Sequence, residues 1–262
     1  MNIAYVATED GDIAPKARGS SGFMSRTGVL LYGVLSYGVG MSSLFWMILS
    51  LAGLVPMGLA GVQVSNVLLA SALNIALLVA FGVQHSVMAR PWFKARMTRW
   101  LPEAAERSTF VLSSGLVLWN AIAFWQPLPG IVWQVEAAWA VWTLWGLFGL
   151  GWGYMLLATF AIDHFDLFGL RQVWLHWRER AYEPVQFKRR LMYRHSRHPI
   201  MLGVLVGIWA TPVMSAAQLT LAVILTAYVV IGLVFEERDL IDNLGDAYRA
   251  YRKEVGAFTP WV

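Results

Sequence analysis

Long apolar runs constrain the fold of this chain more than any other feature. They cover residues 28–54, 66–83, 109–125, 138–162, 199–211 and 218–235. A helix that crosses about 30 Å of hydrocarbon needs about 20 apolar residues, and most of these runs approach or exceed that length. Only 14% of the residues are charged, whereas about 25% are charged in soluble domains. The sequence therefore predicts an all-α, polytopic integral membrane bundle.

Lysine and arginine predict the orientation of this bundle. The basic stretches are the N-terminal tail, 86–108, 163–198 and the C-terminal tail, whereas the turns 55–65, 126–137 and 212–217 contain neither residue. Short basic loops stay in the cytoplasm, so both termini are expected there. We interpret residues 1–24 as a disordered cytoplasmic tail and residues 25–262 as one membrane domain.

The last two apolar runs predict a C-terminal hairpin that follows four spanning helices. The run 199–211 is short, about 20 Å at 1.5 Å per residue, so this hairpin either crosses the membrane or is re-entrant. Pro212 ends the run, and the segment PVMSAAQ makes the turn. His198 and Glu236 are about equally far from the tip, and we expect them to meet at the same level.

The cluster RHSRHP stands directly before this hairpin. Pro199 suits the first position of a helix because its missing N–H would be unpaired there anyway. The first amides, at Ile200, Met201 and Leu202, would then point toward the cytoplasm and form an anion site with the helix dipole. Arg197 adds a guanidinium that suits a carboxylate.

The segment FEERDL places carboxylates at the other end of the hairpin. Glu236 and Glu237 facing an anion site would suit a zwitterion with a ribose. The simpler alternative is an interfacial ion pair without a ligand. Gly203 and Gly207 permit the close approach of another backbone or of a flat ligand. The residues that form one apolar stripe of an amphipathic helix, either a lid or an anchor, are Leu240, Leu244, Tyr248, Tyr251 and Val255.

RHPIMLG, an apolar hairpin and FEERDLIDNLGDAYRAYRKEV together resemble the C-terminal signature of the isoprenylcysteine carboxyl methyltransferase superfamily. This resemblance implies that residues 190–262 bind S-adenosylmethionine at the cytosolic membrane face and release S-adenosylhomocysteine. The family motif has a tyrosine where this chain has Ile200 or Met201. The cofactor residues that the resemblance implies are Tyr193, Arg197, His198, Pro199, Leu202, Gly203, Glu236, Glu237, Tyr248 and Tyr251.

Three further stretches resemble the bacterial membrane-bound methanethiol S-methyltransferase family. They are FGVQHSVMARPWFK, PEAAERSTFVLSSGLVLWNAIAFWQPLP and TFAIDHFDLFGLRQVWLHWRERAYEPVQFKRRLMYRHSRHP. The resemblance implies methylation of methanethiol to dimethyl sulfide in a bacterial inner membrane.

Methylation of a thiol requires a thiolate, and even a cysteine thiol has a pKa near about 8.5. A general base is therefore useful. We expect one in His164, with Asp163 or Asp166 as the orienting carboxylate, or in His85. The alternative for both histidines is a structural role. The predicted residues of the substrate pocket are Gln84, Phe165, Phe168, Arg171 and Gln172.

The composition argues against a metal ion or a nucleic acid as a partner. The chain has no cysteine and five histidines, and none of the histidines forms a paired ligand motif, so we expect no metal site. No basic stripe interleaved with aromatics suggests nucleic acid. Two alternatives stay open: a lipid-like or prenylated acceptor, and a non-enzymatic denitrification-associated membrane protein. The oligomeric state is undetermined.

Overall fold

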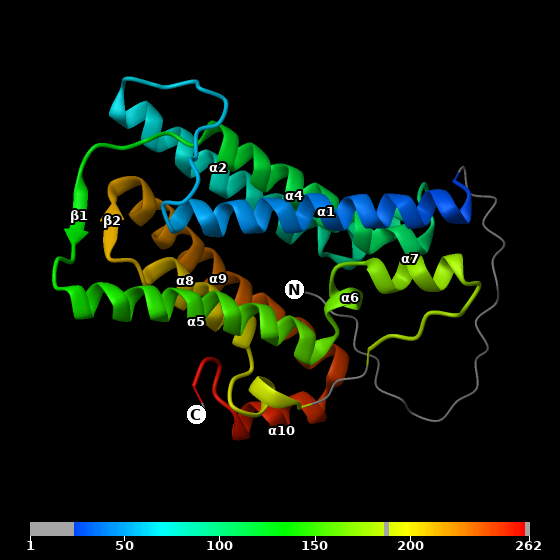
Figure 1. Ribbon diagram of the computed structural model, residues 1–262. Coiled ribbons are helices and arrows are strands. Elements are labelled where there is room, and N and C mark those ends of the chain that lie inside the picture. Colours follow the sequence, from blue (N-terminus) through cyan, green and yellow to red (C-terminus); the bar gives the residue numbers. More distant parts are fainter. Residues whose placement is uncertain (1–23, 186–188, 260–262) are drawn as a thin grey trace.

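The computed structural model describes residues 24–185 and 189–259, and most of this part of the chain is helical (Figure 1). The tail that we expected to be disordered lies, up to residue 23, outside the described residues. The long helices are α1 (Arg26–Leu51), α2 (Val67–Met88), α4 (Glu106–Phe124), α5 (Ala138–Ile162) and α9 (Ala216–Leu244). The predicted all-α membrane fold is confirmed.

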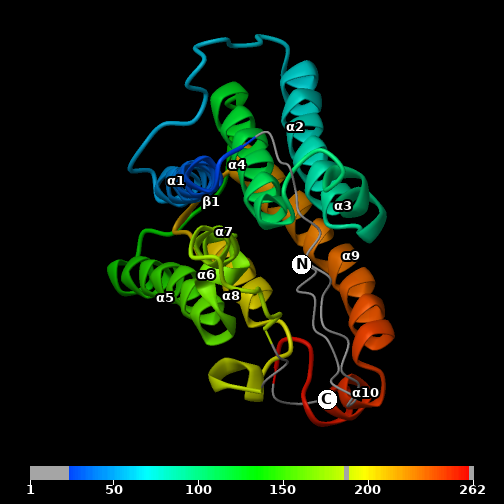
Figure 2. The ribbon, with the colours of Figure 1, turned by 90° about the vertical axis from the view of Figure 1, so that its right-hand side faces the viewer.

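Four of these helices, α1, α2, α5 and α9, are long and apolar enough to cross a membrane. Helix α4 was expected among the spanning helices but is not one of the four, and it packs along α1 and α2. Figure 2 shows α2, α4 and α9 together on one side of the molecule, with α5 and α8 on the other. The chain is an integral membrane protein.

Glycines let two pairs of helices approach closely. A Cβ added to Gly115 of α4 would lie 2.8 Å from the Cα of Gly40 on α1. A Cβ added to Gly203 of α8 would lie 2.6 Å from the carbonyl oxygen of Gly151 on α5. Small residues allow backbones to approach in this way inside membranes. Gly203 and Gly207 on α8 therefore serve the packing of α8 against α5.

The C-terminal hairpin consists of α8 (Pro199–Trp209) and α9. Helix α8 has 11 residues, about 16 Å in length and roughly half the thickness of the hydrocarbon. Helix α9 does not end at residue 235 as expected but continues to Leu244, where Gly245 with φ 56° turns the chain into α10 (Asp246–Glu254). The two glutamates therefore lie within a helix and not beyond its end.

A short sheet, which the sequence did not predict, joins two turns at one end of the bundle. Strand β1 (Ile131–Gln134) pairs antiparallel with β2 (Val213–Ser215), and Trp133 lies opposite Met214. The remaining short elements lie away from this sheet (Figure 1). They are α3 (Pro91–Met97), α6 (His164–Leu167), α7 (Leu170–Trp177) and 3₁₀ helices at Glu103–Ala105 and Leu191–Arg194.

Candidate functional site

The loop that leads into α8 is held against the C-terminal segment. The amides of Arg197 and His198 donate to the carbonyl oxygens of Gly256 and Ala257, each over 3.1 Å. Pro199 then opens α8 with a preset φ and no N–H to satisfy. These main-chain contacts fix the directions in which the side chains of Arg197 and His198 leave the backbone.

The first amides of α8 differ in part from the expectation. No side chain caps this end of the helix. The amide of Leu202 donates to the carbonyl oxygen of His198 over 3.0 Å, so the expectation that it helps to form an anion site is wrong. The amides of Ile200 and Met201 are the two that still fit such a site.

Glu237 is the centre of a charged cluster, which we call the Glu237 hub. Its Oε1 accepts hydrogen bonds from Nε of Arg197 at 2.8 Å and from Nε2 of His198 at 3.1 Å. The hydroxyl of Tyr248 donates to the same oxygen over 3.5 Å, and Nε of Arg252 lies 3.3 Å from Oε2. The hub thus joins the loop before α8 with α9 and α10. Figure 2 shows α10 directly at the end of α9.

Burial explains why the hub needs so many partners. The side chain of Glu237 is 9% exposed, and a buried carboxylate is costly unless cations and donors surround it. Glu236 is also buried, and its Oε2 lies 3.8 Å from Nδ1 of His198. The expectation that His198 and Glu236 meet at one level is therefore confirmed.

The predicted apolar stripe does not lie on one helix: Leu240 and Leu244 belong to α9, and Tyr248 and Tyr251 belong to α10 beyond the turn at Gly245. Leu244, Tyr248, Tyr251 and Val255 form one buried cluster. The hydroxyl of Tyr251 donates to the main-chain oxygens of Tyr193 and Ser196. Burial raises the pKa of Tyr251 to about 12, and burial followed by the charge of Glu237 raises the pKa of Tyr248. Both phenols therefore act as neutral donors.

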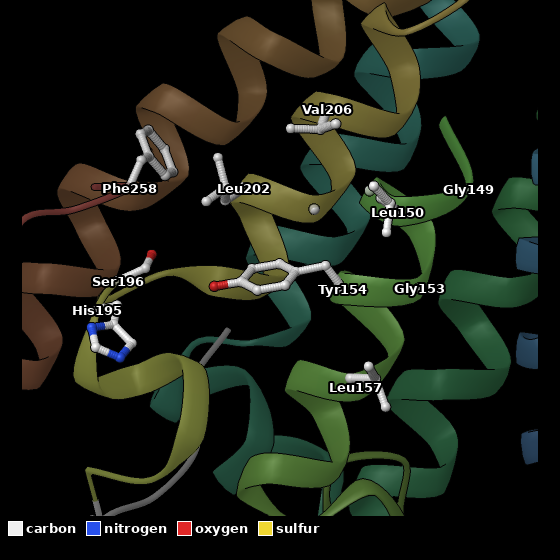
Figure 3. Close-up of a pocket in the computed structure, with 12 residues that line it drawn as sticks. Gly149, Leu150, Gly153, Tyr154, Leu157, His195, Ser196, Leu202, Val206 and Phe258 are labelled. Carbon is white, nitrogen blue, oxygen red and sulfur yellow. The ribbon is translucent and has the colours of Figure 1, made fainter. Parts of the chain in front are cut away.

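A cavity of about 540 Å³ lies between α5 and α8 (Figure 3). Leu202 and Gly203 line it, together with glycines and apolar side chains of α5. At one end the lining consists of His195, Ser196 and Phe258. This cavity touches the first turns of α8 and follows its α5 side.

His164 lies in an aromatic box at the start of α6. Its Nδ1 is 2.8 Å from Oγ1 of Thr159, and its Nε2 is 2.9 Å from the hydroxyl of Tyr37. The ring stacks on Phe160 with a centroid distance of 4.2 Å. Because the Thr159 hydroxyl donates to Leu156 O, it accepts from Nδ1, and Nε2 accepts from Tyr37. Both ring nitrogens are thus used within the protein.

Two predicted residues of the substrate pocket belong to this box. Phe165 meets the His164 ring edge-on at 5.5 Å, and Phe168 lies 4.8 Å from it between centroids. Burial lowers the pKa of His164, and the nearby charge of Asp163 partly offsets this effect. The imidazole is therefore neutral at pH 7.

The two aspartates do not orient this histidine by hydrogen bonds, contrary to our expectation. Asp163 instead caps α6 by accepting from the amide of Asp166. Asp166 pairs with Arg171 at 3.2 Å and accepts from Tyr182 over 3.3 Å, while Gln172 donates to its main-chain oxygen. Burial raises the pKa of Asp166 and that of Tyr182, the latter to about 12. These side chains stabilise the segment that connects α5 with α7.

His85 lies in a second group of aromatic rings, which we call the His85 chamber. Phe81, Phe110 and Tyr228 surround the imidazole, with the Phe110 centroid 4.7 Å away. Nδ1 lies 3.2 Å from Oγ of Ser114. In the described part of the chain, Nε2 of His85 makes no hydrogen bond. The imidazole is thus held through one nitrogen.

Gln84, which was predicted beside His85, also belongs to this chamber. Its Nε2 lies 3.4 Å from Oγ of Ser114, and its buried Oε1 has no hydrogen-bond partner among the described residues. The chamber continues along the contact between α2 and α9, because Ser86 bonds to Tyr228 at 3.3 Å and Arg90 pairs with Asp239 at 3.1 Å. This contact leads toward the hub.

Several residues of these sites were missed by sequence reasoning. Arg252 follows Tyr248 by one helical turn, so the helical period of α10 could have identified it. Tyr228 precedes Glu236 by about two turns on an apolar helix, which is a weaker signal. The others, Tyr37, Thr159 and Ser114, carry no local signal because their partners lie on other helices.

Comparison with known proteins gives several relatives. Methanethiol S-methyltransferase of Mycobacterium tuberculosis is 47% identical over 188 residues, which cover 72% of this chain and 77% of that protein. The protein of the same name from a Pseudomonas species is 41% identical over 239 residues, with 91% and 92% covered. Methanethiol S-methyltransferase 1 of Bradyrhizobium diazoefficiens is 40% identical over 262 residues, with 100% and 91% covered. No family model and no solved structure matches the chain.

Proposed function

The chain belongs to the methanethiol S-methyltransferase family, and from this premise we propose that it transfers the methyl group of S-adenosylmethionine to methanethiol. Membership of the family makes it a thiol methyltransferase. The methyl donor, the acceptor, the residues that bind them and the face of the membrane are parts of the proposal. The products would be dimethyl sulfide and S-adenosylhomocysteine.

The chemistry of the hub fits the proposed donor. S-adenosylmethionine carries a carboxylate, an ammonium group and a ribose, and when bound it supplies a methyl group that is activated by a sulfonium. The amides of Ile200 and Met201 are oriented for an anion. The carboxylates of Glu236 and Glu237 suit an ammonium group or ribose hydroxyls. Hydrogen-bond donors and acceptors for both charged groups of a zwitterion thus lie near the start of α8.

One observation carries the proposal: the Glu237 hub connects three segments of the C-terminal region, namely the loop before α8, α9 and α10. A single buried carboxylate holds Arg197 and His198 of the loop before α8 and also Arg252 of α10. A purely interfacial ion pair would not need to bury a carboxylate so deeply, because long side chains reach water at such an interface. We therefore favour a ligand-binding role over a structural one.

We further propose that His85 is the general base and that the His85 chamber receives the thiol. This role requires the tautomer in which Oγ of Ser114 accepts from Nδ1–H of His85, because only then is Nε2 able to accept the thiol proton. His164, by contrast, uses both ring nitrogens inside the protein. Phe81, Phe110 and Tyr228 would exclude water from the thiolate.

The distance between hub and chamber suits an extended ligand. Tyr228 of the chamber and Glu236 of the hub are eight residues apart on α9, which corresponds to about 12 Å along a helix axis. Methyl transfer is an in-line displacement, so the main task of the protein is to align the two reactants. Nε2 of His85 would take the thiol proton, and bound S-adenosylmethionine would supply the methyl group to the resulting thiolate.

The charge distribution supports a cytoplasmic site in the inner membrane of a bacterium. Elements α3, α7 and α10, which belong to the basic stretches, lie away from the β1–β2 sheet (Figure 1). The turns that form the sheet contain no lysine or arginine. Because basic loops stay in the cytoplasm, we propose that the hub and both termini face it.

The names of the relatives favour this function over the two alternatives. They describe enzymes that act on a one-carbon thiol, which argues against a non-enzymatic accessory protein. They also favour a small acceptor over a lipid-like or prenylated one.

Binding measurements on variants of the purified protein test the role of the hub. We expect Glu237→Gln to bind S-adenosylhomocysteine about 10- to 100-fold more weakly, because hydrogen bonds to charged groups contribute about 1.5–3 kcal/mol. Asp246→Asn is the matched control, since its carboxylate also belongs to the C-terminal region but is fully exposed. Equal affinities of the two variants would contradict the proposed site.

A further inference from the structure

The cavity between α5 and α8 is lined by no residue of the Glu237 hub or the His85 chamber, and it lies where lipid meets the protein. Two of its lining residues, Leu202 and Gly203, are among those that the resemblance implies for the cofactor. Leu150 and Leu157, which line it, are 69% and 59% exposed on the spanning helix α5. A volume of about 540 Å³ lies in the range of sites for drug-sized ligands and far exceeds the need of a one-carbon thiol. The cavity is therefore a groove open to the hydrocarbon.

Glycines of α5 create this groove. A Cβ added to Gly149 or Gly153 would meet no atom of the described residues within 4 Å, although both glycines line the groove. Gly151 differs, because a Cβ there would lie 2.7 Å from the amide nitrogen of Gly207 on α8. Gly151 thus serves helix packing, whereas Gly149 and Gly153 leave an apolar space that hydrocarbon fills in a bilayer.

The groove becomes polar at the end where α8 begins. His195 and Ser196 line this end, and the phenol of Tyr154 points across the groove toward them (Figure 3). No arginine among the described residues lines the groove, but Arg194, next to His195, is exposed, as is Arg190, whereas Arg189 pairs with Glu254. Basic pockets between membrane helices bind anionic lipid headgroups. The apolar groove, with its polar end next to the exposed cation of Arg194, is therefore complementary to an anionic amphiphile.

We propose that this groove binds one anionic phospholipid, with an acyl chain along Gly149 and Gly153 and the phosphate at Arg194 and His195. The acyl chain contacts Leu202 and Val206 on the opposite wall of the groove. The bound lipid thereby supports the first turns of α8, directly after the loop that carries Arg197 and His198. Apart from Leu202 and Gly203, the residues that line this site are not among those named for the proposed reaction.

Native mass spectrometry of protein exchanged into mixed micelles of phosphatidylglycerol and phosphatidylcholine tests the proposal. The key variant is Gly153→Leu, whose side chain fills the groove. Gly146→Leu is the matched control, because Gly146 lies on the same helix, has the same open space for a Cβ and does not line the groove. We expect wild type and Gly146→Leu to retain one phosphatidylglycerol, and Gly153→Leu to retain at least fivefold less.

Two further variants distinguish the binding of the acyl chain from the binding of the headgroup. Gly153→Ala, a smaller change that favours the helix, should lose less lipid than Gly153→Leu while remaining folded. Arg194→Gln should reduce the preference for phosphatidylglycerol over phosphatidylcholine about fivefold, which is the effect of one cation near a lipid surface. Equal retention by Gly153→Leu and Gly146→Leu, or a wild type without preference for the anionic lipid, would overturn the proposal.

Discussion

The two histidines of this protein that lie among aromatic rings differ in how their nitrogens are used. His164 gives Nδ1 to Thr159 and Nε2 to Tyr37 and is 3% exposed. His85 bonds to Ser114 through Nδ1, and among the described residues it has no second partner. A histidine whose two ring nitrogens are both hydrogen-bonded within the protein positions its neighbours. A histidine with only one hydrogen-bonded nitrogen can still exchange a proton through the other.

The surroundings of the two histidines strengthen this contrast. His85 lies where α2, α4 and α9 meet, and α9 continues from this chamber into the hub. His164 lies between α1, α5 and α6, and the carboxylates near it are occupied with α6 and Arg171. Similar aromatic rings thus surround both histidines, but His85 is a candidate base and His164 has a structural role.

The largest expected effect comes from His85→Ala. We expect kcat for methanethiol to fall about 100-fold or more, as is usual when a general base is removed, while the affinity for S-adenosylhomocysteine changes less than about twofold. His176→Ala on α7 is the control and should leave kcat unchanged. The comparison would break if His85→Ala kept at least half of the wild-type rate.

His164→Ala should act on stability. Removing the ring leaves a cavity among Phe160, Phe165 and Phe168 and takes a partner from Tyr37, so the free energy of unfolding should fall by about 3 kcal/mol. Thermal unfolding in detergent measures the loss. The protein that remains folded should keep kcat within about threefold of wild type. A loss of kcat of the size expected for His85→Ala would reverse the two roles.

A third way to sharpen the comparison is the pH dependence of stability. The pKa of His164 is lower in the folded protein than its ordinary value of 6.5, so below pH 6.5 the unfolded state binds more protons. Stability should therefore fall as the pH drops below 6.5, by at most about 1.4 kcal/mol per pH unit. His164→Gln should lack this part of the dependence. An unchanged dependence in His164→Gln would show that the imidazole is not held neutral.

The smallest expected effect is that of Tyr37→Phe, which removes one hydrogen bond and about 1 kcal/mol of stability. Tyr32→Phe is the matched control on the same helix, because the Tyr32 hydroxyl donates to Thr109 at a similar distance of 2.9 Å. Both variants should lose similar stability, but only Tyr37→Phe should alter the pH dependence that His164 causes. Identical pH profiles would contradict the contact between Tyr37 and the imidazole.

The sequence predicts those parts of this protein that depend on local patterns. Apolar length located the membrane helices, and the expected boundaries of 138–162 agree with α5. The hairpin brought His198 and Glu236 together because helical rise sets their level. The apolar residues 244–255 do form one buried cluster, but the turn at Gly245 divides the predicted single helix into the end of α9 and α10.

Other features depend on contacts between distant segments and have no local signal. The pairing of β1 with β2 joins residues about 80 positions apart. The same holds for the hydrogen bonds of His164 to Tyr37 and of His85 to Ser114. The carboxylates next to His164 suggested an orienting partner, but the short helix α6 needed Asp163 as its cap. Adjacency in sequence was a poor guide because backbone groups compete for the same side chains.

The central claim is that this chain moves a methyl group from S-adenosylmethionine to methanethiol. The most direct test incubates purified protein with S-adenosylmethionine carrying a deuterated methyl group and with unlabelled methanethiol, and measures headspace dimethyl sulfide by gas chromatography and mass spectrometry. We predict dimethyl sulfide with one deuterated methyl group from wild type and strongly reduced amounts from Glu237→Gln. Folded wild-type protein that binds S-adenosylmethionine and yet forms no labelled dimethyl sulfide would contradict the account.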